Sequence, residues 1–230
     1  MEINKLLTKV NYRQGRNKLN KYIVIHYVGA TGGAEANCRY FLSNYRGASA
    51  HYFVGHAGEV WQCVEDKNIA WHCGAARYKH AYCRNENSIG IELCCKKNVS
   101  NNTWYFEEET VKAAIELTKE LMAKYNIPIG NVIRHYDVTG KVCPEPYVRD
   151  SAAWETFKAN LISNPAPVAS GYKVKVTADS LNVRKGAGVL HKVTTVIHKG
   201  EVYTIVDECN GWGKLKSGAG WINLKYTKKI

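Results

Sequence analysis

The chain has 230 residues, of which 45% are hydrophobic, and its 32 Lys and Arg exceed its 20 Asp and Glu by 12. This length predicts one or two domains, and the near-average composition excludes wholesale disorder. No window approaches 18 consecutive apolar residues, so we expect no membrane-spanning helix. The positive charge indicates an anionic partner, and nucleic acid, a membrane surface and an anionic cell-wall polymer all satisfy that condition.

Eight cysteines raise the question of disulfide bonds. An even number would indicate a disulfide framework in a short secreted chain. The first five residues, however, lack the apolar stretch of a secretory signal, and Cys94 and Cys95 stand together in an apolar run. We therefore expect mostly reduced thiols. The sequence contains no CxxC pair, which excludes a four-cysteine zinc ribbon.

A small, uncharged, proline-bearing segment divides the chain. Residues 164–171 read Asn-Pro-Ala-Pro-Val-Ala-Ser-Gly, which is linker composition. The part before residue 165 carries 21 Lys and Arg against 16 Asp and Glu, whereas the 66 residues that follow carry 11 against 4. We therefore predict a domain at 1–163, a linker at 164–171 and a second, more basic domain at 172–230.

The N-terminal part mixes strand and helix patterns. Apolar runs predict strands at 22–28 and 88–94, and alternation around a glycine turn predicts a hairpin over 51–64. A 3.6-residue apolar repeat predicts a helix over 107–125, with a weaker helix at 34–45 and a short strand at 131–135. These elements interleave, which indicates an α/β domain with a central mixed sheet flanked by helices.

The C-terminal part shows no helical periodicity. Short alternating runs around Val174, Val183 and Ile205 are separated by glycine-rich turns. Short strands at close spacing predict a small all-β barrel.

Three possible metal ligands stand at the ends of predicted elements. His26 lies near the end of the first strand, His135 follows another, and Cys143 comes eight residues later, directly before a proline. Two histidines and one cysteine suit a single Zn²⁺ and leave a fourth position for water, whose pKa falls to about 7 in such sites. The alternative is that both histidines are hydrogen-bonded core residues and that the cysteine is merely a small buried side chain.

Two charged residues could serve chemistry at such a site. Lys141, two residues before Cys143, could stabilise an oxyanion on a polarised carbonyl, or it could be an ordinary surface lysine. Glu92 stands in an otherwise apolar strand, where a carboxylate is costly unless it is paired or faces a cleft. It could act as a general base, or it could reflect the alternation of a half-exposed strand.

The N-terminal domain resembles the type 2 N-acetylmuramoyl-L-alanine amidases, a family shared by phage endolysins and animal peptidoglycan-recognition proteins. The resemblance covers about 140 residues and rests on segments 23–26, 50–54, 70–72, 87–92 and 135–144, of which the last is the most specific. It implies that His26, His135 and Cys143 bind zinc, that Lys141 polarises the scissile carbonyl or holds the oxyanion, and that Glu92 is the general base.

The resemblance also assigns residues around the second predicted strand. Many members carry a catalytic tyrosine where this chain has His51, so either His51 or the following Tyr52 is expected to take that role or to line the cleft. Trp71 and His72 match a substrate-lining loop and are expected to contact a sugar or peptide. Asp137 is either a residue that orients a ligand histidine or a solvated loop residue.

The C-terminal domain resembles bacterial SH3-type wall-binding modules. Its segment Leu-Asn-Val-Arg at 181–184, followed by Gly186, matches their signature, and 212–215 and 220–222 match later strands. Aromatic side chains are candidates for wall contacts, although most aromatics in so small a barrel are core residues. The candidates are Tyr172, Tyr203, Trp212 and Tyr226.

These observations favour a zinc amidase that cleaves the bond between N-acetylmuramic acid and L-alanine in peptidoglycan and is held on the wall by its second domain. We expect synthesis in the bacterial cytoplasm and action after release during host lysis, with a host autolysin as the second possibility.

A non-catalytic peptidoglycan-binding protein is the main alternative, but such relatives typically lose the cysteine ligand. A cysteine peptidase would need a histidine downstream of Cys143, and those present lie in the second domain. Neither domain shows a groove-reading motif, so nucleic acid is not expected as a partner, and the oligomeric state stays open.

Overall fold

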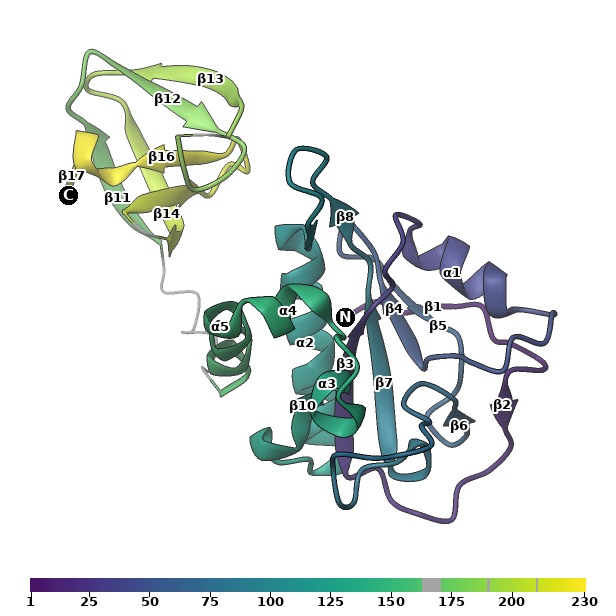
Figure 1. Ribbon diagram of the computed structural model, residues 1–230. Coiled ribbons are helices and arrows are strands. Elements are labelled where there is room, and N and C mark those ends of the chain that lie inside the picture. The colour runs from purple at the N-terminus through teal and green to yellow at the C-terminus, as the bar shows by residue number, and fades with distance from the viewer. Residues whose placement is uncertain (163–170, 190, 210) are drawn as a thin grey trace. The chain divides into compact units, whose positions relative to one another are not determined.

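The computed structural model of the protein describes residues 1–162, 171–189, 191–209 and 211–230 (Figure 1). The predicted linker therefore lies outside the described residues except for Gly171. The chain divides into two compact units, Met1–Ser163 and Asn164–Ile230, which are treated separately below. None of the described helices is long and apolar enough to cross a bilayer.

The first unit is built on a six-stranded sheet with the strand order β1-β5-β4-β7-β3-β10. Strands β4, β7, β3 and β10 run parallel, whereas β5 is antiparallel to β4, so the predicted mixed sheet is confirmed. The strands of this sheet are β1 (Asn4–Lys5), β3 (Tyr22–Tyr27), β4 (Tyr52–Val54), β5 (Val60–Gln62), β7 (Ser88–Leu93) and β10 (Val132–Arg134). Two small pairs accompany it: β2 (Tyr12–Arg13) with β6 (Ile69–Ala70), and β8 (Lys96–Lys97) with β9 (Trp104–Tyr105).

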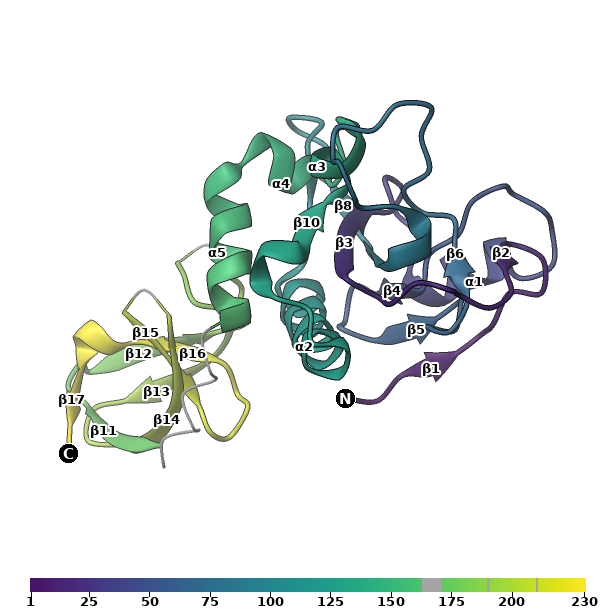
Figure 2. The same cartoon turned by 90° about the horizontal axis from the view of Figure 1, so that it is seen from below.

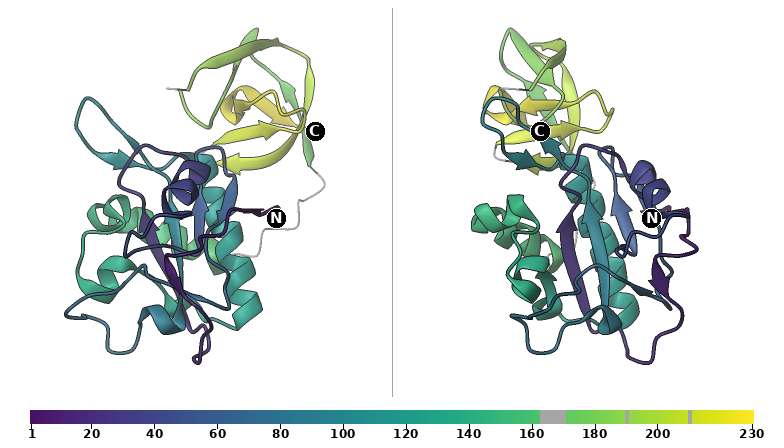
Figure 3. Two further views of the ribbon diagram at one scale, coloured as in Figure 1. Left: turned by 90° about the vertical axis from the view of Figure 1, so that its right-hand side faces the viewer. Right: turned by 45° about the vertical axis from the view of Figure 1, so that its right-hand side comes forward.

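Helices cover both faces of this sheet (Figures 1 and 2). On one face α2 packs along the strands with α5 beside it, and α1 covers β4 and β5 on the other, as the two further views agree (Figure 3). The predicted helix over 107–125 is confirmed, that at 34–45 is shorter than expected, and α5 was not predicted. The helices are α1 (Ala34–Phe41), α2 (Glu108–Tyr125), α3 (His135–Thr139), α4 (Glu145–Arg149) and α5 (Ser151–Ile162), with 3₁₀ turns at Asn85–Asn87 and Ile129–Asn131.

Alternation along the strands sorts side chains between the two faces. Ile23 and Ile25 of β3, like Ile89 and Ile91 of β7, join the core beneath α2. Residues of the other parity, among them His26, therefore project toward the opposite face, where Val24 packs in a separate apolar cluster. This face carries the candidate site.

The second unit is all-β apart from one 3₁₀ turn at Leu224–Tyr226 among its described residues. Its strands form one antiparallel sheet in the order β13-β12-β16-β15-β14-β11-β17 around an apolar core that includes Val174, Val183, Ile205 and Ile222. The strands are β11 (Tyr172–Val176), β12 (Ser180–Arg184), β13 (Val193–His198), β14 (Val202–Cys209), β15 (Trp212–Leu215), β16 (Trp221–Asn223) and β17 (Thr227–Lys229). The predicted all-β character is confirmed.

Seven cysteines, from Cys38 to Cys143, are buried free thiols that form no disulfide bond. This agrees with the expectation of reduced thiols. Most serve as small core residues, with Cys38, Cys63 and Cys94 packed in one cluster under α1.

Candidate metal centre and active site

The three predicted metal ligands meet on the sheet face opposite α2. His26 projects from β3, His135 is the first residue of α3 directly after β10, and Cys143 lies in the loop before α4. Their donor atoms all lie within 4.8 Å of one another, although His26 and Cys143 are 117 positions apart in the chain. Parallel pairing of β3 with β10 brings the two histidines together, because the carboxyl ends of parallel strands meet at one edge of the sheet.

A tight loop returns Cys143 to His26. Gly140 ends α3 with a φ of 85°, a left-handed conformation that glycine adopts without steric cost, and its N–H donates to the Tyr136 carbonyl at 2.8 Å. The N–H of Tyr136 donates to the Cys143 carbonyl at 2.8 Å and closes the loop. Lys141 is carried on the same loop, so ligand and ammonium are held as one piece.

The donor set fits a zinc ion. Cys143 Sγ lies 3.7 Å from His26 Nδ1. This is close to the spacing of about 3.3–3.6 Å between two such atoms that bind one tetrahedral zinc ion. His135 Nδ1 is buried and has no hydrogen-bond partner among the described residues, although a buried polar atom normally has one. A bound cation would accept a lone pair from each of the three residues and would give His135 Nδ1 the partner that it lacks.

The protonation states of the ligands are consistent with that fit. Burial lowers the pKa of His26 well below its usual value, and the neighbouring His135 lowers it further. Burial likewise lowers the pKa of His135 to about 4, and the positive charge of Lys141 acts in the same direction. Both rings are therefore neutral at pH 7, and each has a lone pair free. Burial raises the pKa of the Cys143 thiol to about 12. A cation would have to displace that proton, as zinc does when it binds thiols.

Glu92 stands beside His26 on the neighbouring strand. The two residues are register partners of β3 and β7, and Glu92 Oε1 lies 4.0 Å from His26 Nδ1. Its side chain is 20% exposed, and Oε2 has no hydrogen-bond partner among the described residues. Burial raises the pKa of Glu92 to about 8, and the Lys141 ammonium acts in the opposite direction.

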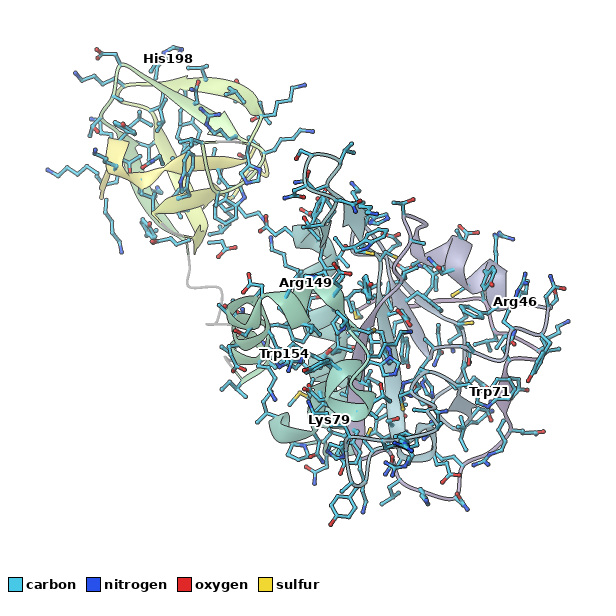
Figure 4. All side chains as sticks on the ribbon, in the orientation of Figure 1. Arg46, Trp71, Lys79, Arg149, Trp154 and His198 are labelled. Carbon is cyan, nitrogen blue, oxygen red and sulfur yellow. The ribbon has the colours of Figure 1, made fainter. Side chains whose placement is uncertain are left out.

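A cavity of 280 Å³ opens above these groups, and a cleft of 820 Å³ adjoins it. The cavity is lined by the three ligands, Glu92 and Lys141, and both spaces share Trp71, His72, His135 and Lys141. Trp71 lies across the sheet from Trp154 of α5 (Figure 4). Trp71 and His72 thus line the space where they were predicted to meet substrate.

Two predictions for residues 51 and 52, at the start of β4, are wrong. Tyr52 has the parity of the α2 face, where it is 3% exposed and its hydroxyl donates to Asp66 at 2.6 Å, so it cannot contact substrate. His51 is fully buried and lines neither cavity: its Nδ1 accepts the Gly90 N–H at 3.0 Å, and its Nε2 lies 3.3 Å from the Asn68 carbonyl. Phe53, the register partner of Glu92, is the β4 side chain that lines the cavity.

Other residues of the cavity were not singled out in the sequence. Tyr27 follows His26, lines the cavity, and its hydroxyl donates to Glu145 at 3.3 Å. Ser49 also lines it, and its Oγ accepts the Trp71 N–H at 2.9 Å. A tyrosine directly after a ligand histidine was the only sequence signal for either residue.

Asp137 does not orient His135. Its carboxylate accepts three hydrogen bonds from Arg134, one from the main-chain N–H and two from the guanidinium, at 2.8–3.0 Å. The Arg134 guanidinium in turn donates to the Tyr147 carbonyl at 2.9 Å. The pair therefore fixes the turn into α3, on which His135 is carried.

Known proteins that are similar to this chain are amidases. The chain matches the family described as N-acetylmuramoyl-L-alanine amidase over residues 16–146, more than half of its length. A probable N-acetylmuramoyl-L-alanine amidase of Bacillus licheniformis is 33% identical over an alignment of 154 residues that covers 62% of this chain and 41% of that protein. The amidase BlyA of Bacillus subtilis is 34% identical over 153 residues, 60% of this chain and 40% of BlyA. The chain thus spans about two fifths of the length of these relatives.

Solved structures resemble about 70% of the chain. A mutant endolysin from Bacillus subtilis superimposes with a TM-score of 0.57 at 30% identity, covering 70% of this chain and 99% of that one. The catalytic domain of XlyA gives the same TM-score at 29% identity, covering 70% and 99%. With the matched residues including all three ligands, Glu92 and Lys141, the chain belongs to the N-acetylmuramoyl-L-alanine amidase family.

Proposed function

We propose that the protein hydrolyses the amide bond between N-acetylmuramic acid and L-alanine in bacterial peptidoglycan, with one Zn²⁺ held by His26, His135 and Cys143. The observation that carries this proposal is the convergence of three donor atoms within 4.8 Å below a cavity that also holds Glu92 and Lys141. When bound, zinc supplies Lewis acidity that makes water more acidic and polarises a carbonyl. A recognition protein without catalysis would not need the carboxylate or the ammonium.

The chain's own residues supply proton transfer and charge. Glu92 accepts the proton of the attacking water as its oxygen bonds to the lactyl carbonyl carbon, and it later delivers that proton to the departing alanine nitrogen. The carbon–nitrogen bond breaks, leaving a carboxylate on the muramic acid and a free amine on alanine. Glu92 would be kept ionised as a base near neutral pH by a divalent cation held beside it, which would lower the raised pKa of the carboxylate.

Lys141 lies on the open side of the same cavity. It is exposed and lines both the cavity and the cleft, so its ammonium faces the space where a carbonyl oxygen would gain negative charge. A fixed positive charge there stabilises the tetrahedral oxyanion more than the substrate. Trp71 contributes an apolar wall for the glycan or stem peptide on the cleft side.

The second unit is proposed as an SH3-type module that holds the enzyme on the wall. Its surplus of basic residues supports binding to peptidoglycan or to anionic wall polymers, and tethering raises the local concentration of the enzyme. Among the four aromatic candidates, Tyr226 is 44% exposed, whereas Trp212 is 8% exposed and is a core residue rather than a wall contact. Tyr172 and Tyr203 pack partly against the core, and their hydroxyls donate to Glu208 and Glu201. We further propose synthesis in the bacterial cytoplasm and action on the wall after release.

The test is zinc analysis paired with product analysis on purified peptidoglycan. We expect one zinc per chain, loss of activity in a chelator and recovery on adding Zn²⁺. Mass spectrometry should find new free amino groups on alanine with intact glycan strands. Cleavage inside the stem peptide, or full activity in a Cys143→Ser variant that has lost its zinc, would overturn the proposal.

A further inference from the structure

A buried chain of hydrogen-bonding groups runs from His26 away from the other two proposed ligands, His135 and Cys143. His26 Nε2 lies 3.0 Å from His72 Nδ1, and His72 Nε2 lies 3.1 Å from Ser88 Oγ. Ser88 Oγ lies 2.7 Å from the carbonyl oxygen of Arg84. His26 is 1% exposed, His72 8% and Ser88 0%, so no bulk water competes for these contacts.

The far end of this chain sets the direction of every hydrogen bond. A main-chain carbonyl can only accept, so the single proton of the Ser88 hydroxyl goes to Arg84. The Ser88 oxygen must then accept from His72 Nε2–H, which leaves Nδ1 of a neutral His72 with a lone pair. That lone pair accepts from His26 Nε2–H. His26 is consequently left with a bare Nδ1, the atom that lies 3.7 Å from Cys143 Sγ.

The position of the His72 ring is fixed by contacts with Gly90, His51 and Asn85. A Cβ at Gly90 would lie 2.5 Å from His72 Cγ and 2.8 Å from Nδ1, so only glycine at this position of β7 leaves room for the ring. The His51 ring packs edge-on at 5.7 Å between centroids. Asn85 Oδ1 accepts the main-chain N–H groups of His72 and Cys73 at 3.1 and 2.8 Å. The ring is therefore held by three separate segments.

We propose that His72 is a positioning residue that holds His26 in the Nε2–H tautomer and presents Nδ1 to the metal. This inference rests on the proposed zinc site but not on the identity of the substrate. Both ring nitrogens of His72 are engaged in this chain of hydrogen bonds, and the residue also lines the cavity. Partners of this kind are worth about 10- to 100-fold in metal affinity.

The experiment compares zinc affinity by competition with a chromogenic chelator in the full chain and its variants. In His72→Phe, which keeps an aromatic ring but has no acceptor, we expect affinity to fall about 10- to 100-fold. In His72→Asn the amide oxygen stands near the position of Nδ1 and can still accept from His26, so most of the affinity should return. Ser88→Ala should give a smaller loss, since it leaves His72 free to reverse its tautomer. Thr118→Ala is the matched control, because it also deletes a buried hydroxyl that donates to a main-chain carbonyl, but on the far face of the sheet.

A second measurement does not involve zinc. Long-range ¹⁵N–¹H correlation spectra of the chelated wild-type protein report which nitrogen of His26 carries the proton, and we expect Nε2. Protonation at Nδ1, or unchanged zinc affinity in a folded His72→Phe, would overturn the inference. If His72→Phe does not fold, Ser88→Ala and the wild-type spectrum still decide. A wild-type protein that binds no zinc would refute the proposed function. The tautomer of His26 would still test whether the chain of hydrogen bonds through His72 and Ser88 has the inferred direction.

Discussion

At the scale of single residues, the site depends on which face of a strand a side chain occupies. His26 and Glu92 differ by one position from Ile25 and Ile91, yet the isoleucines lie in the core and the polar pair borders a cavity. A shift of register by one residue would exchange them. The burial that surrounds Glu92 also raises the pKa of its carboxylate to about 8.

Glu92→Gln should separate catalysis from metal binding. The amide cannot accept the proton of the attacking water, so hydrolysis of peptidoglycan should fall about 10²- to 10⁴-fold, measured as free alanine amines released. Glu92 is not one of the three ligands, so zinc content should be unchanged. Glu116→Gln on the solvent side of α2 is the control and should retain full activity. Activity of Glu92→Gln within threefold of wild type would remove Glu92 from the mechanism.

At the scale of elements, one buried carboxylate joins α2 to the sheet. Asp66, in the loop after β5, accepts the Tyr52 and Tyr125 hydroxyls at 2.6 Å each, the Lys124 ammonium at 2.9 Å and the Gln62 amide at 3.2 Å. Tyr52 belongs to β4, whereas Lys124 and Tyr125 end α2. The carboxylate therefore anchors the last turn of the helix against the strand that carries Phe53.

Asp66→Asn should destabilise the first unit. The substitution removes the charge that these donors share and leaves buried hydroxyls imperfectly paired, at a cost of about 2–4 kcal/mol in the free energy of unfolding. Urea denaturation followed by tryptophan fluorescence measures it. The control is Glu65→Gln next to it, whose side chain is 40% exposed and should shift stability by less than about 0.5 kcal/mol. Equal effects of the two substitutions would contradict the anchoring role.

The same carboxylate predicts a pH dependence. Burial acts to raise the pKa of Asp66, but hydrogen bonds from Tyr125, Tyr52 and Lys124 outweigh it and leave the pKa below its usual value. Above the usual value near 3.8 both folded and unfolded states are ionised, and the stabilisation is complete. As pH falls through the lowered pKa the unfolded state has already taken up its proton, so the contribution is lost. Urea midpoints measured from pH 6 to pH 3 should fall less steeply in Asp66→Asn than in wild type; parallel curves would refute this.

At the scale of the whole molecule, the chain is two compact units, each with its own apolar core. The ligands, Glu92, Lys141 and both cavities lie entirely in the first, and the denser positive charge lies in the second. The division separates the proposed chemistry from the proposed attachment to the wall.

Residues 1–163 expressed alone should therefore fold and bind zinc with the affinity of the full chain. Sedimentation with purified cell walls should show weaker wall association of this fragment, while activity on a soluble muramoyl-peptide should be unchanged, because no site residue is removed. The full chain carrying Cys143→Ser should sediment as wild type does. A fragment that sediments like the full chain would show that the second unit is not the anchor.

The sequence by itself determined the elements of the first unit whose burial is periodic, the all-β character of the second, and the three residues that we propose as zinc ligands. Apolar period and glycine turns are local properties, and the segment from His135 to Cys143 is a local motif. The unpredicted α5 shows the limit, because its pattern is weakly periodic and its Trp154 and Phe157 become core residues only when the folded chain packs them against other elements.

Only the tertiary structure decided which residues share the site. The predictions for Tyr52 and His51 failed because the partners of both side chains lie more than ten positions away in the chain. The Tyr52 hydroxyl donates to Asp66, and a ring nitrogen of His51 accepts the Gly90 N–H. The relay from His26 through His72 and Ser88 likewise joins three segments that no local pattern connects. The sequence gives the type of each residue, but the folded structure sets the partner and the direction of each hydrogen bond. A donor can form a bond only with an acceptor that the fold brings within reach.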